Sequence, residues 1–503
     1  MSVNNHKISQ ETFDETLLEN QELFELSEKD AIDETISQFK QQEIDNLEAY
    51  IIISHPESET GIQERQTRKN FEVHLNALDE CVAEDGTVGL DENDAALGSK
   101  QAEKIVNALE GVLDYCNGTV QDENIVGETI YDKAMPFLTL FHSSSSLFTL
   151  MSFLGIIPLE SEPTEDQMMV LNKVTMVMTA ILSARRPGER DIKAIIKDKF
   201  FAMERLLLLI SLFVDLCKRC DSRQDEFIDT LRKLVKLASV ACRNSERNKV
   251  SLVRAFKNSK ESMEKTSTIE LLIRGLKVAV EAYKQEGSKI FGAVSLITEF
   301  CQLIAVLCRY DDFRPSGGGA LGVDSSYGNN VSSAHDHVME FNRNGVVPVL
   351  HEITLIALTT DLNALVENNE CSSMEEDLVS LAAAALSATR VLAINDESVQ
   401  GLVAVGMLKV IKLALEMGVK EVLEGNQGGK KQEETKKQRQ HLTAGAIGLI
   451  RNLCGNDEIK TTICLGISSD PSSSSLHVIL EGMRLYRDNA SIQEHGLGAL
   501  AAM

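Results

Sequence analysis

Two histidines and three aspartates near the middle of the chain have side chains that could bind a divalent metal ion. His335 and His337 stand in "SAHDH" with Asp336 between them, and Asp311 and Asp312 stand in the preceding "YDDFRP". Neutral imidazoles and carboxylates suit divalent transition metals. Histidines in this pattern also cap helices or bond backbone carbonyls, and we favour that interpretation. We therefore predict no metal site and no cofactor, and keep metal-dependent chemistry at His335 and His337 as a minor hypothesis.

Cysteines offer a second candidate. Cys217 and Cys220 have the spacing of half a zinc site or of a redox pair. The sequence has no second pair at a matching distance and no histidine nearby, so we interpret them as helical cysteines one turn apart. Cys301 and Cys308, two turns apart on one helix face, are predicted to be core residues.

Glycine-rich and basic stretches complete the candidates. Gly317 to Gly319 and "GNQGGKK" at 425–431 lack a following Lys-Ser or Lys-Thr, so we interpret them as flexible loops rather than phosphate-binding loops. A basic cluster contains Lys430, Lys431, Lys436, Lys437 and Arg439. This cluster could be a nuclear-import or anion-binding patch, although we favour the interpretation that it is a solvated loop. No aromatic residue is interleaved there on which single-stranded nucleic acid could stack. We expect no enzymatic activity, no small-molecule substrate and no nucleic-acid partner.

Composition favours helices. The chain has 503 residues with eight prolines and 5% aromatics, and it is rich in straight-chain residues that lose little rotamer freedom in a helix. Its longest apolar runs, such as "LLLLISLFV" at 206–214, are shorter than the roughly 18 residues that a bilayer requires, so no membrane partner is expected. Ten cysteines and an opening without the apolar core of a signal peptide indicate a reducing compartment. We expect the cytoplasm, with the nucleus as the alternative.

The negative charge is concentrated at the N-terminus. Residues 1–127 hold 29 acidic and 8 basic side chains, which is most of the formal net charge of −26. Such a field repels nucleic acids and could attract basic proteins. A solvated, partly mobile segment is the simpler interpretation.

A short motif recurs along the chain. "LCGNDE" at 453–458 resembles "LAINDE" at 392–397, "ACRNSE" at 241–246 and, more loosely, "LCRYDD" at 307–312, each after a helical stretch with a small apolar interior. The intervals approach the roughly 40 to 47 residues of helical armadillo or HEAT units once polar insertions are subtracted. We expect these insertions to be loops near 257–267, 314–337, 361–376 and 424–440.

Each unit has a recognisable physical design. Small residues, such as Ala383 to Ala385 and Gly445, let neighbouring helices approach, while Leu386, Leu449 and Leu453 fill the layer between units. An asparagine then ends one helix and caps the next, where first-turn acids also stabilise the helix; these are Asn395 and Asn456 with their following Asp-Glu pairs. Glycines stand where a short helix must turn into a longer one, at Gly345, Gly406 and Gly466.

This three-helix pattern closely resembles armadillo repeats, and the N-terminus resembles one family in particular. Residues 8–51 are similar to the opening of the armadillo repeat-containing protein 6 family, with Gln10 to Asp14, Glu19-Asn20 and Gln38-Phe39 in register. "YDDFRP" followed by "SAHDH" is similar to a loop of that family, although a Gly/Ser-rich insertion at 316–332 separates the two halves here. The resemblance implies an armadillo superhelix in a eukaryotic intracellular protein that binds partners.

We accordingly predict an all-α protein, a right-handed α-α superhelix of armadillo or HEAT type with an acidic helical N-terminal extension. The expected parts are an acidic helical segment at 1–55, a linker and first helices at 56–107, and the repeat solenoid at 108–503. Because "HGLGALAAM" at 495–503 overlays "GAIGLIRNL" at 445–453, we expect the sequence to be a fragment that stops within a repeat.

The third helices of armadillo superhelices line a concave groove that can hold an extended peptide. In importin-α-like members, ladders of Asn and Trp line it. Here the Asn positions fall on Val240, Val306, Val391 and Asn452, the Trp positions fall on Lys236, Gln302, Ser387 and Gly448, and the chain has no Trp. A standard receptor for nuclear localisation signals is therefore not expected. The candidate partner contacts are Lys236, Gln302, Arg390, Arg451 and Asn452.

Two functions remain open at this point. The leading hypothesis is a non-enzymatic scaffold that holds a protein or peptide partner in the groove. The alternative is that the acidic N-terminal segment binds basic proteins as a chaperone would, with the solenoid as its platform.

Overall fold

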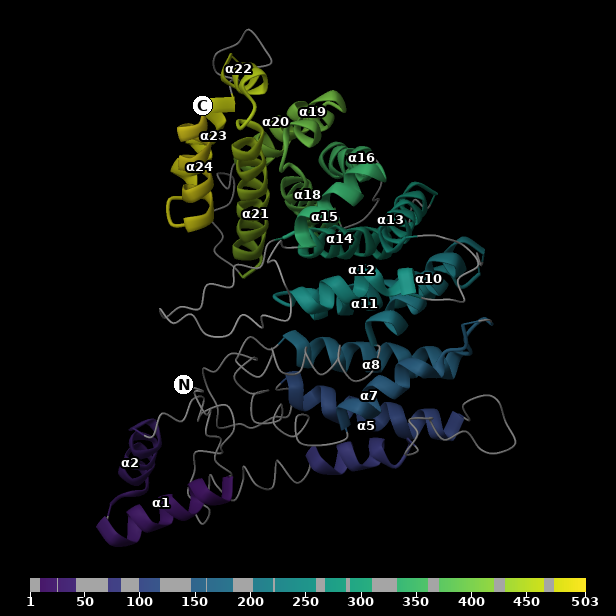
Figure 1. Ribbon diagram of the computed structural model, residues 1–503, viewed down its shortest axis with the longest axis vertical. Helices are drawn as coiled ribbons and strands as arrows, with labels where there is room; N and C mark the ends of the chain where they lie inside the picture. The colour runs from purple at the N-terminus through teal and green to yellow at the C-terminus, as the bar shows by residue number, and fades with distance from the viewer. Residues whose placement is uncertain are drawn as a thin grey trace. The chain divides into compact units, whose positions relative to one another are not determined.

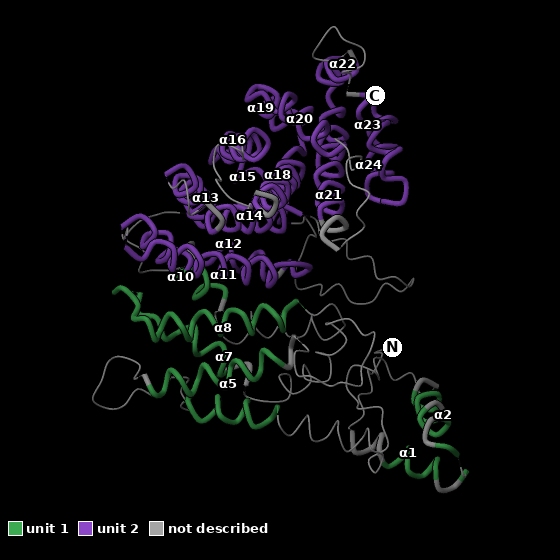
Figure 2. The backbone as a smooth tube through the Cα atoms, turned by 180° about the vertical axis from the view of Figure 1, so that it is seen from behind, with its two compact units in different colours: residues 1–209 green, residues 210–503 purple. Residues whose placement is uncertain are grey.

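The computed structural model describes fourteen stretches of the chain, and within them the residues form helices and no β-strand. The described residues are 10–24, 26–41, 71–82, 99–117, 146–159, 161–183, 202–219, 222–258, 267–285, 290–309, 333–360, 371–419, 430–465 and 475–503. The contacts divide the chain into two units, residues 1–209 and 210–503, which Figure 2 distinguishes by colour. The all-α class predicted from composition is confirmed.

The first unit begins with a helical hairpin of α1 (Gln10–Phe24) and α2 (Glu28–Gln41). Ser27 caps the start of α2: its Oγ accepts a hydrogen bond from the Asp30 backbone N–H at 3.3 Å and donates to the Asp30 carboxylate at 2.6 Å. Together these bonds satisfy a backbone donor that a helix start otherwise leaves open and place a negative charge in the first turn.

Hydrogen bonds between side-chain amides join the two helices of the hairpin. Asn20 is 3% exposed, and it exchanges two hydrogen bonds with Gln38, at 3.1 and 3.2 Å. Its Nδ2 also donates to the buried hydroxyl of Thr35 at 2.8 Å. Asn20 and Gln38 belong to the pattern that carries the family resemblance. Because a buried amide needs its partners, this pairing favours a single register of the hairpin.

The other described residues of the first unit form mainly helices, several of which pack on one another. They are a helix at 71–79, α5 (Ser99–Asn117), α7 (Ser146–Phe153) with the 3-10 turn η1 (Leu154–Ile156), and α8 (Glu165–Ser183). α5 packs against α8, and α7 packs against η1 and α8. Arg205 donates to the carbonyls of Leu154, Gly155 and Ile157, and so caps the end of η1.

The second unit repeats a sequence of a first, a second and a third helix. The first helices are α12 (Glu246–Asn258), α15 (Ser333–Arg343), α19 (Asp396–Ala404) and α22 (Asp457–Leu465). The second helices are α13 (Thr268–Gln285), α16 (Val346–Thr359), α20 (Met407–Val419) and α23 (Ser475–Leu485), with α10 (Ala202–Arg219) before them. The third helices are α11 (Gln224–Cys242), α14 (Ile290–Leu307), α18 (Cys371–Leu392), α21 (Lys430–Leu453) and α24 (Ala490–Ala502).

Helices of the same kind stack on one another. Each of α11, α14, α18 and α21 packs against the next third helix, up to α24, and this series is called the third-helix row (Figure 1). The second helices α13, α16, α20 and α23 stack in the same way, and each packs on the third helix of its own unit. Such a stack, in which each unit buries its apolar faces against its neighbours, is a helical solenoid. The predicted solenoid of armadillo type is confirmed.

Small residues set the spacing of the row, as predicted. An added Cβ on Gly445 of α21 would lie 3.4 Å from Leu386 Cβ and 3.7 Å from the Ala383 carbonyl oxygen of α18, so the two helices approach closely there. Leu386, Leu449 and Leu453 are all fully buried. The predicted core layer between units is therefore confirmed.

Turns and caps also follow the sequence. Asn395 Oδ1 accepts from the Ser398 N–H at 2.8 Å, and Asn456 Oδ1 accepts from the Ile459 N–H at 3.3 Å. Gly345 and Gly406 have φ of 74° and 91°, a left-handed backbone that glycine adopts without steric cost. Gly466 lies outside the described residues.

All four of the stretches expected as loops are partly helical. α12 ends at Asn258, within 257–267. α15 begins at Ser333, within 314–337; α18 begins at Cys371, within 361–376; and α21 begins at Lys430, within 424–440. The basic cluster of Lys430, Lys431, Lys436, Lys437 and Arg439 therefore lies on a helix rather than in a loop. The prediction relied on polarity, whereas Lys, Gln, Glu and Arg are also strong helix formers, and here they extend an apolar helix outward.

Candidate partner-binding surface

The five candidate contacts lie on the third-helix row. Lys236 is on α11, Gln302 is at the matching position of α14, Arg390 is on α18, and Arg451 and Asn452 are on α21. Lys236 and Arg451 are exposed, and the other three are half-buried. The fold thus places on successive helices residues that are far apart in the sequence.

Arg390 extends from α18 over the next helix of the row. An added Cβ on Gly448 of α21 would lie 2.8 Å from Arg390 Cδ and 3.1 Å from His495 Cδ2, so the glycine leaves room for both side chains. Arg390 Nη1 lies 2.5 Å from His495 Nε2, on α24. Since a guanidinium only donates, the imidazole Nε2 accepts, and His495 is neutral in this contact.

The same arrangement recurs one helix further along. An added Cβ on Gly498 of α24 would lie 2.7 Å from Arg451 Nε, so Arg451 of α21 lies over α24 as Arg390 lies over α21. Arg451 Nη1 reaches Glu494 Oε1 at 3.5 Å. Each arginine therefore needs a glycine on the following helix, at positions 448 and 498.

Charges in this region are unevenly balanced. Burial lowers the pKa of Arg390, and the positive charges of Arg309 and Arg451 lower it further, while Glu494 opposes them. Burial likewise lowers the pKa of His495, with Arg390 and Arg451 acting in the same direction and Glu494 against them. Positive charge therefore predominates around Arg390.

Asn452 is the retained asparagine of the peptide-binding ladder, but its amide bonds within the protein. Its Nδ2 donates to the Arg390 carbonyl of α18 at 2.9 Å. Val240, at the matching position of α11, is 5% exposed and belongs to the core. Asn452 thus ties α21 to α18, and this is a structural contact in addition to the predicted partner contact.

Lys236 lies near a carboxylate of the next third helix. Burial raises the pKa of Glu299 on α14, and the positive charges of Lys236, Arg232 and Arg243 oppose that rise. In the part of the chain that the structure describes, no hydrogen bond or ion pair joins Lys236 or Gln302 to the cluster around Arg390. The candidate residues therefore form two groups, one on α11 and α14 and one on α18 and α21.

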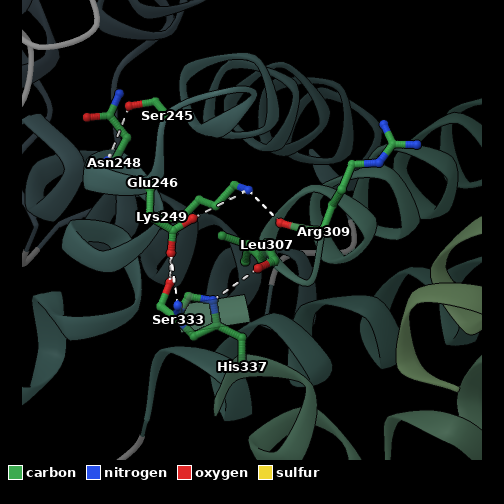
Figure 3. A network of polar contacts seen from close by, with 8 residues as sticks. All are labelled: Ser245, Glu246, Asn248, Lys249, Leu307, Arg309, Ser333 and His337. Carbon is green, nitrogen blue, oxygen red and sulfur yellow. Dashed lines mark hydrogen bonds and ion pairs between the residues drawn. The ribbon is translucent and has the colours of Figure 1, made fainter. Parts of the chain in front are cut away.

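The histidine motif separates into one exposed and one buried side chain. His335 is exposed, whereas His337 is 4% exposed and its Nδ1 donates to the Leu307 carbonyl at the end of α14, at 3.0 Å (Figure 3). His337 therefore bonds a backbone carbonyl, as the favoured interpretation predicts. Asp311 and Asp312 lie outside the described residues.

A buried lysine completes this polar network, which Figure 3 shows. Lys249 of α12 is fully buried; its Nζ donates to the Arg309 carbonyl at 2.8 Å and lies 3.8 Å from a Glu246 carboxylate oxygen. Glu246 accepts bonds from the backbone N–H and the hydroxyl of Ser333. Helix α12 therefore holds both Arg309 and Ser333, the described residues on either side of positions 310–332.

The buried thiols are part of the core. Cys301 of α14 and Cys308, which directly follows α14, are 0% and 2% exposed, and burial raises the pKa of Cys301 to about 12. Their predicted core role is confirmed. Cys217 is buried on α10, and Cys220 lies outside the described residues.

The described ranges contain neither a metal-binding cluster nor a membrane-spanning helix. No group of three or more His, Cys, Asp or Glu side chains is placed there to hold a metal ion. None of the helices described has the length and apolar character to span a membrane.

The neutral histidines predict a pH dependence of stability. Burial is the main cause that lowers the pKa of His337, and the unfolded chain regains an ordinary histidine pKa of about 6.5. Below that pH the unfolded state binds a proton that the folded state does not bind, so stability is present at pH 7.5 and falls as the pH falls. We expect His337 to account for a loss of about 1 kcal/mol between pH 7.5 and 5.5, measured by urea unfolding.

The neighbouring histidine supplies the control for this measurement. His337→Asn keeps an N–H donor for the Leu307 carbonyl and removes the titrating group, so its stability should change less over this range than that of the wild type. His335→Asn alters an exposed side chain on the same helix and should retain the wild-type pH dependence. Equal pH dependence in all three proteins would contradict a buried neutral His337.

Several residues of the surface were missed by sequence reasoning, namely Arg309, His495 and Glu494. His495 approaches Arg390 from a position 105 residues away, and no local pattern signals such a contact. One sequence signal was available: Gly448 and Gly498 occupy the same position when 495–503 is laid over 445–453. A glycine repeated on the surface of stacked helices indicates that a side chain from the preceding helix lies there.

Comparisons with known proteins identify one part of the chain. Among solved structures, a crystal structure of SYS-1 matches with 10% identity over 99% of this chain and 100% of that chain, but its TM-score of 0.22 supports no argument about this fold. No protein of curated function matches the sequence. Residues 5–68 match the N-terminal domain of armadillo repeat-containing protein 6. That match confirms, for residues 5–68, the resemblance to the armadillo repeat-containing protein 6 family that the opening residues predict.

Proposed function

We propose that this chain is a non-enzymatic interaction scaffold of the cytoplasm, which holds an extended segment of a partner protein along the third-helix row. The observation that carries the proposal is the placement of Lys236, Gln302, Arg390 and Arg451 on four consecutive helices of the row. One extended peptide that crosses successive helices could contact each of them in turn. The armadillo-type solenoid supports this use, because stacked repeats provide long continuous surfaces for binding.

The positive charge of the row favours an acidic partner segment. The row presents Lys236 and Arg451 as exposed cations, with Arg390 half-buried between them. An acidic segment would gain favourable electrostatic contacts, whereas a basic one would be repelled. This preference is opposite to that of receptors for basic nuclear localisation signals.

Photo-crosslinking in the full-length chain tests the proposal. A photoreactive residue is placed at position 236 or 451 on the row, at Lys277 or Lys409 on exposed sites of second helices, or at Glu34 on α2. We expect positions 236 and 451 to crosslink different residues of one extended peptide of the same partner. The second-helix positions should not crosslink that peptide.

A matched pair of variants completes the test. Replacing Lys236, Gln302 and Arg451 together by alanine should lower partner recovery more than tenfold, because each loses a direct contact. Replacing Lys277 and Lys409 by alanine also removes exposed positive charge and should leave recovery unchanged. Crosslinks from position 34 alone, with normal recovery by the row variant, would reject the proposal and favour the acidic N-terminal segment as a binder of basic proteins.

A further inference from the structure

Among the described residues, three arginines lie at or beside the row near one carboxylate. Arg309 follows α14, Arg390 is on α18 and Arg451 is on α21, and the charges of Arg309 and Arg451 both act on Arg390. Glu494 on α24 is the acidic side chain that faces them. With His495 neutral, the described residues of this cluster carry three positive charges and one negative charge.

The arginines retain unused hydrogen-bond donors. A guanidinium has five N–H donors. Among the described residues, Arg390 donates to His495 and has no carboxylate within ion-pair distance, and Glu494, whose charge acts on it, pairs with Arg451. The Arg451 pair is long, at 3.5 Å, and its Glu494 side chain is 73% exposed, so an incoming anion could replace that carboxylate at little cost.

We propose that Arg390 and Arg451, with Arg309 beside them, bind the phosphate of a phosphorylated serine or threonine in the partner segment; this inference rests on the proposed function. A phosphorylated side chain carries a charge of about −1.5 to −2 and three acceptor oxygens, which matches the excess of two positive charges and the free donors. A single aspartate or glutamate would neutralise only half of that excess. Arginine also matches phosphate geometry, because its planar fork donates two parallel hydrogen bonds.

The glycines of the row support this assignment. Gly448 leaves room for Arg390 on α21, and Gly498 leaves room for Arg451 on α24. The contact with His495 also orients the Arg390 guanidinium before any ligand arrives. Holding the donors in advance lowers the entropy cost of binding.

Peptide binding to the full-length chain tests the site. Three sets of fluorescein-labelled 13-residue peptides share the same degenerate uncharged flanks and carry phosphoserine, serine or glutamate at the centre. By fluorescence anisotropy at pH 7.5, we expect the phosphoserine set to bind at least tenfold more tightly than either other set. Inorganic phosphate should compete with it.

Variants localise the binding. Arg390→Gln and Arg451→Gln should each weaken phosphoserine binding about tenfold, as loss of a charge-assisted bond predicts. Gly448→Ala keeps every charge but places a Cβ against Arg390, so it should also weaken binding, and it serves as the second test if Arg390→Gln does not fold. Lys409→Gln, on the second-helix layer, should bind as the wild type does.

Clear outcomes would overturn the inference. Equal binding of the three peptide sets, or unchanged phosphoserine binding in Arg451→Gln, would reject the phosphate site. So would displacement of the phosphoserine peptides by phosphatidylserine vesicles and not by inorganic phosphate, since it would favour a membrane ligand. Crosslinks along the row combined with equal binding of the three sets would leave the proposed function standing and refute only the phosphate site.

Discussion

Gly275→Val is expected to destabilise the second unit by about 3 kcal/mol. Gly275 is buried on α13, and an added Cβ there would lie 2.6 Å from Phe300 Cζ of α14 and 3.0 Å from Val214 Cγ2 of α10. Both neighbours are fully buried, so neither ring nor methyl group can move aside without disturbing the core. Urea unfolding followed by circular dichroism measures the change.

A second glycine provides a control with the opposite sign. Gly401 is exposed on α19, and nothing lies within 4 Å of an added Cβ there. Gly401→Ala should therefore stabilise the helix, by about 0.5 to 1 kcal/mol, because alanine loses less backbone entropy on folding. If Gly275→Val were as stable as the wild type, α13 and α14 could not be packed as closely as the structure shows.

Gly275→Val should also weaken binding of the partner protein. Helix α14 carries Gln302 and lies between α11 and α18 in the third-helix row. A shift of α14 away from α13 would alter the spacing of the row, so partner recovery should fall together with stability. Gly401→Ala should leave partner recovery unchanged.

Lys249→Ala is the second change with a large expected effect, a loss of about 3 kcal/mol. The substitution removes the donor to the Arg309 carbonyl, leaves Glu246 without its cation and opens a cavity in a fully buried site. It also separates α12 from the end of α14, which the buried lysine joins. Urea unfolding again provides the measurement.

Lys249→Met separates the charge from the packing. Methionine fills a similar volume but cannot donate a hydrogen bond, so we expect a smaller loss, of about 1 to 2 kcal/mol. The exposed Lys277→Ala should change stability by less than about 0.5 kcal/mol. If the Lys249→Met variant were as stable as the wild type, packing alone would explain the buried position, and the bond to Arg309 would contribute nothing.

Several features of this protein follow from the sequence by itself. Asn395 and Asn456 cap helices because a short side chain reaches the backbone three residues ahead, and Gly345 and Gly406 turn because only glycine enters the left-handed region freely. The small residues and leucines of the repeats likewise identify the stacked faces. These properties depend on a few neighbouring residues, so a local pattern is sufficient to predict them.

Polarity was a poor guide to loops where a charged stretch is also rich in strong helix formers. The charged stretch that begins at Lys430 was predicted to be a loop, yet it forms the first turns of α21. Ser333 and His337 likewise fall in a stretch expected as a loop, yet they begin α15 and contact α12 and α14. A charged stretch that continues an apolar helix should be interpreted by propensity rather than by polarity.

Only the tertiary structure decided how the candidate residues are used. The repeat pattern placed Arg390, Arg451 and Asn452 on the third-helix row, but it could not show that Asn452 bonds the Arg390 carbonyl 62 residues away. Nor could it show that Arg390 meets His495 across Gly448. Such contacts depend on the distance between stacked helices, which the whole core sets. The sequence alone therefore determines the repeating helices and their caps, while the packing of one repeat on the next decides which cations remain available to a partner.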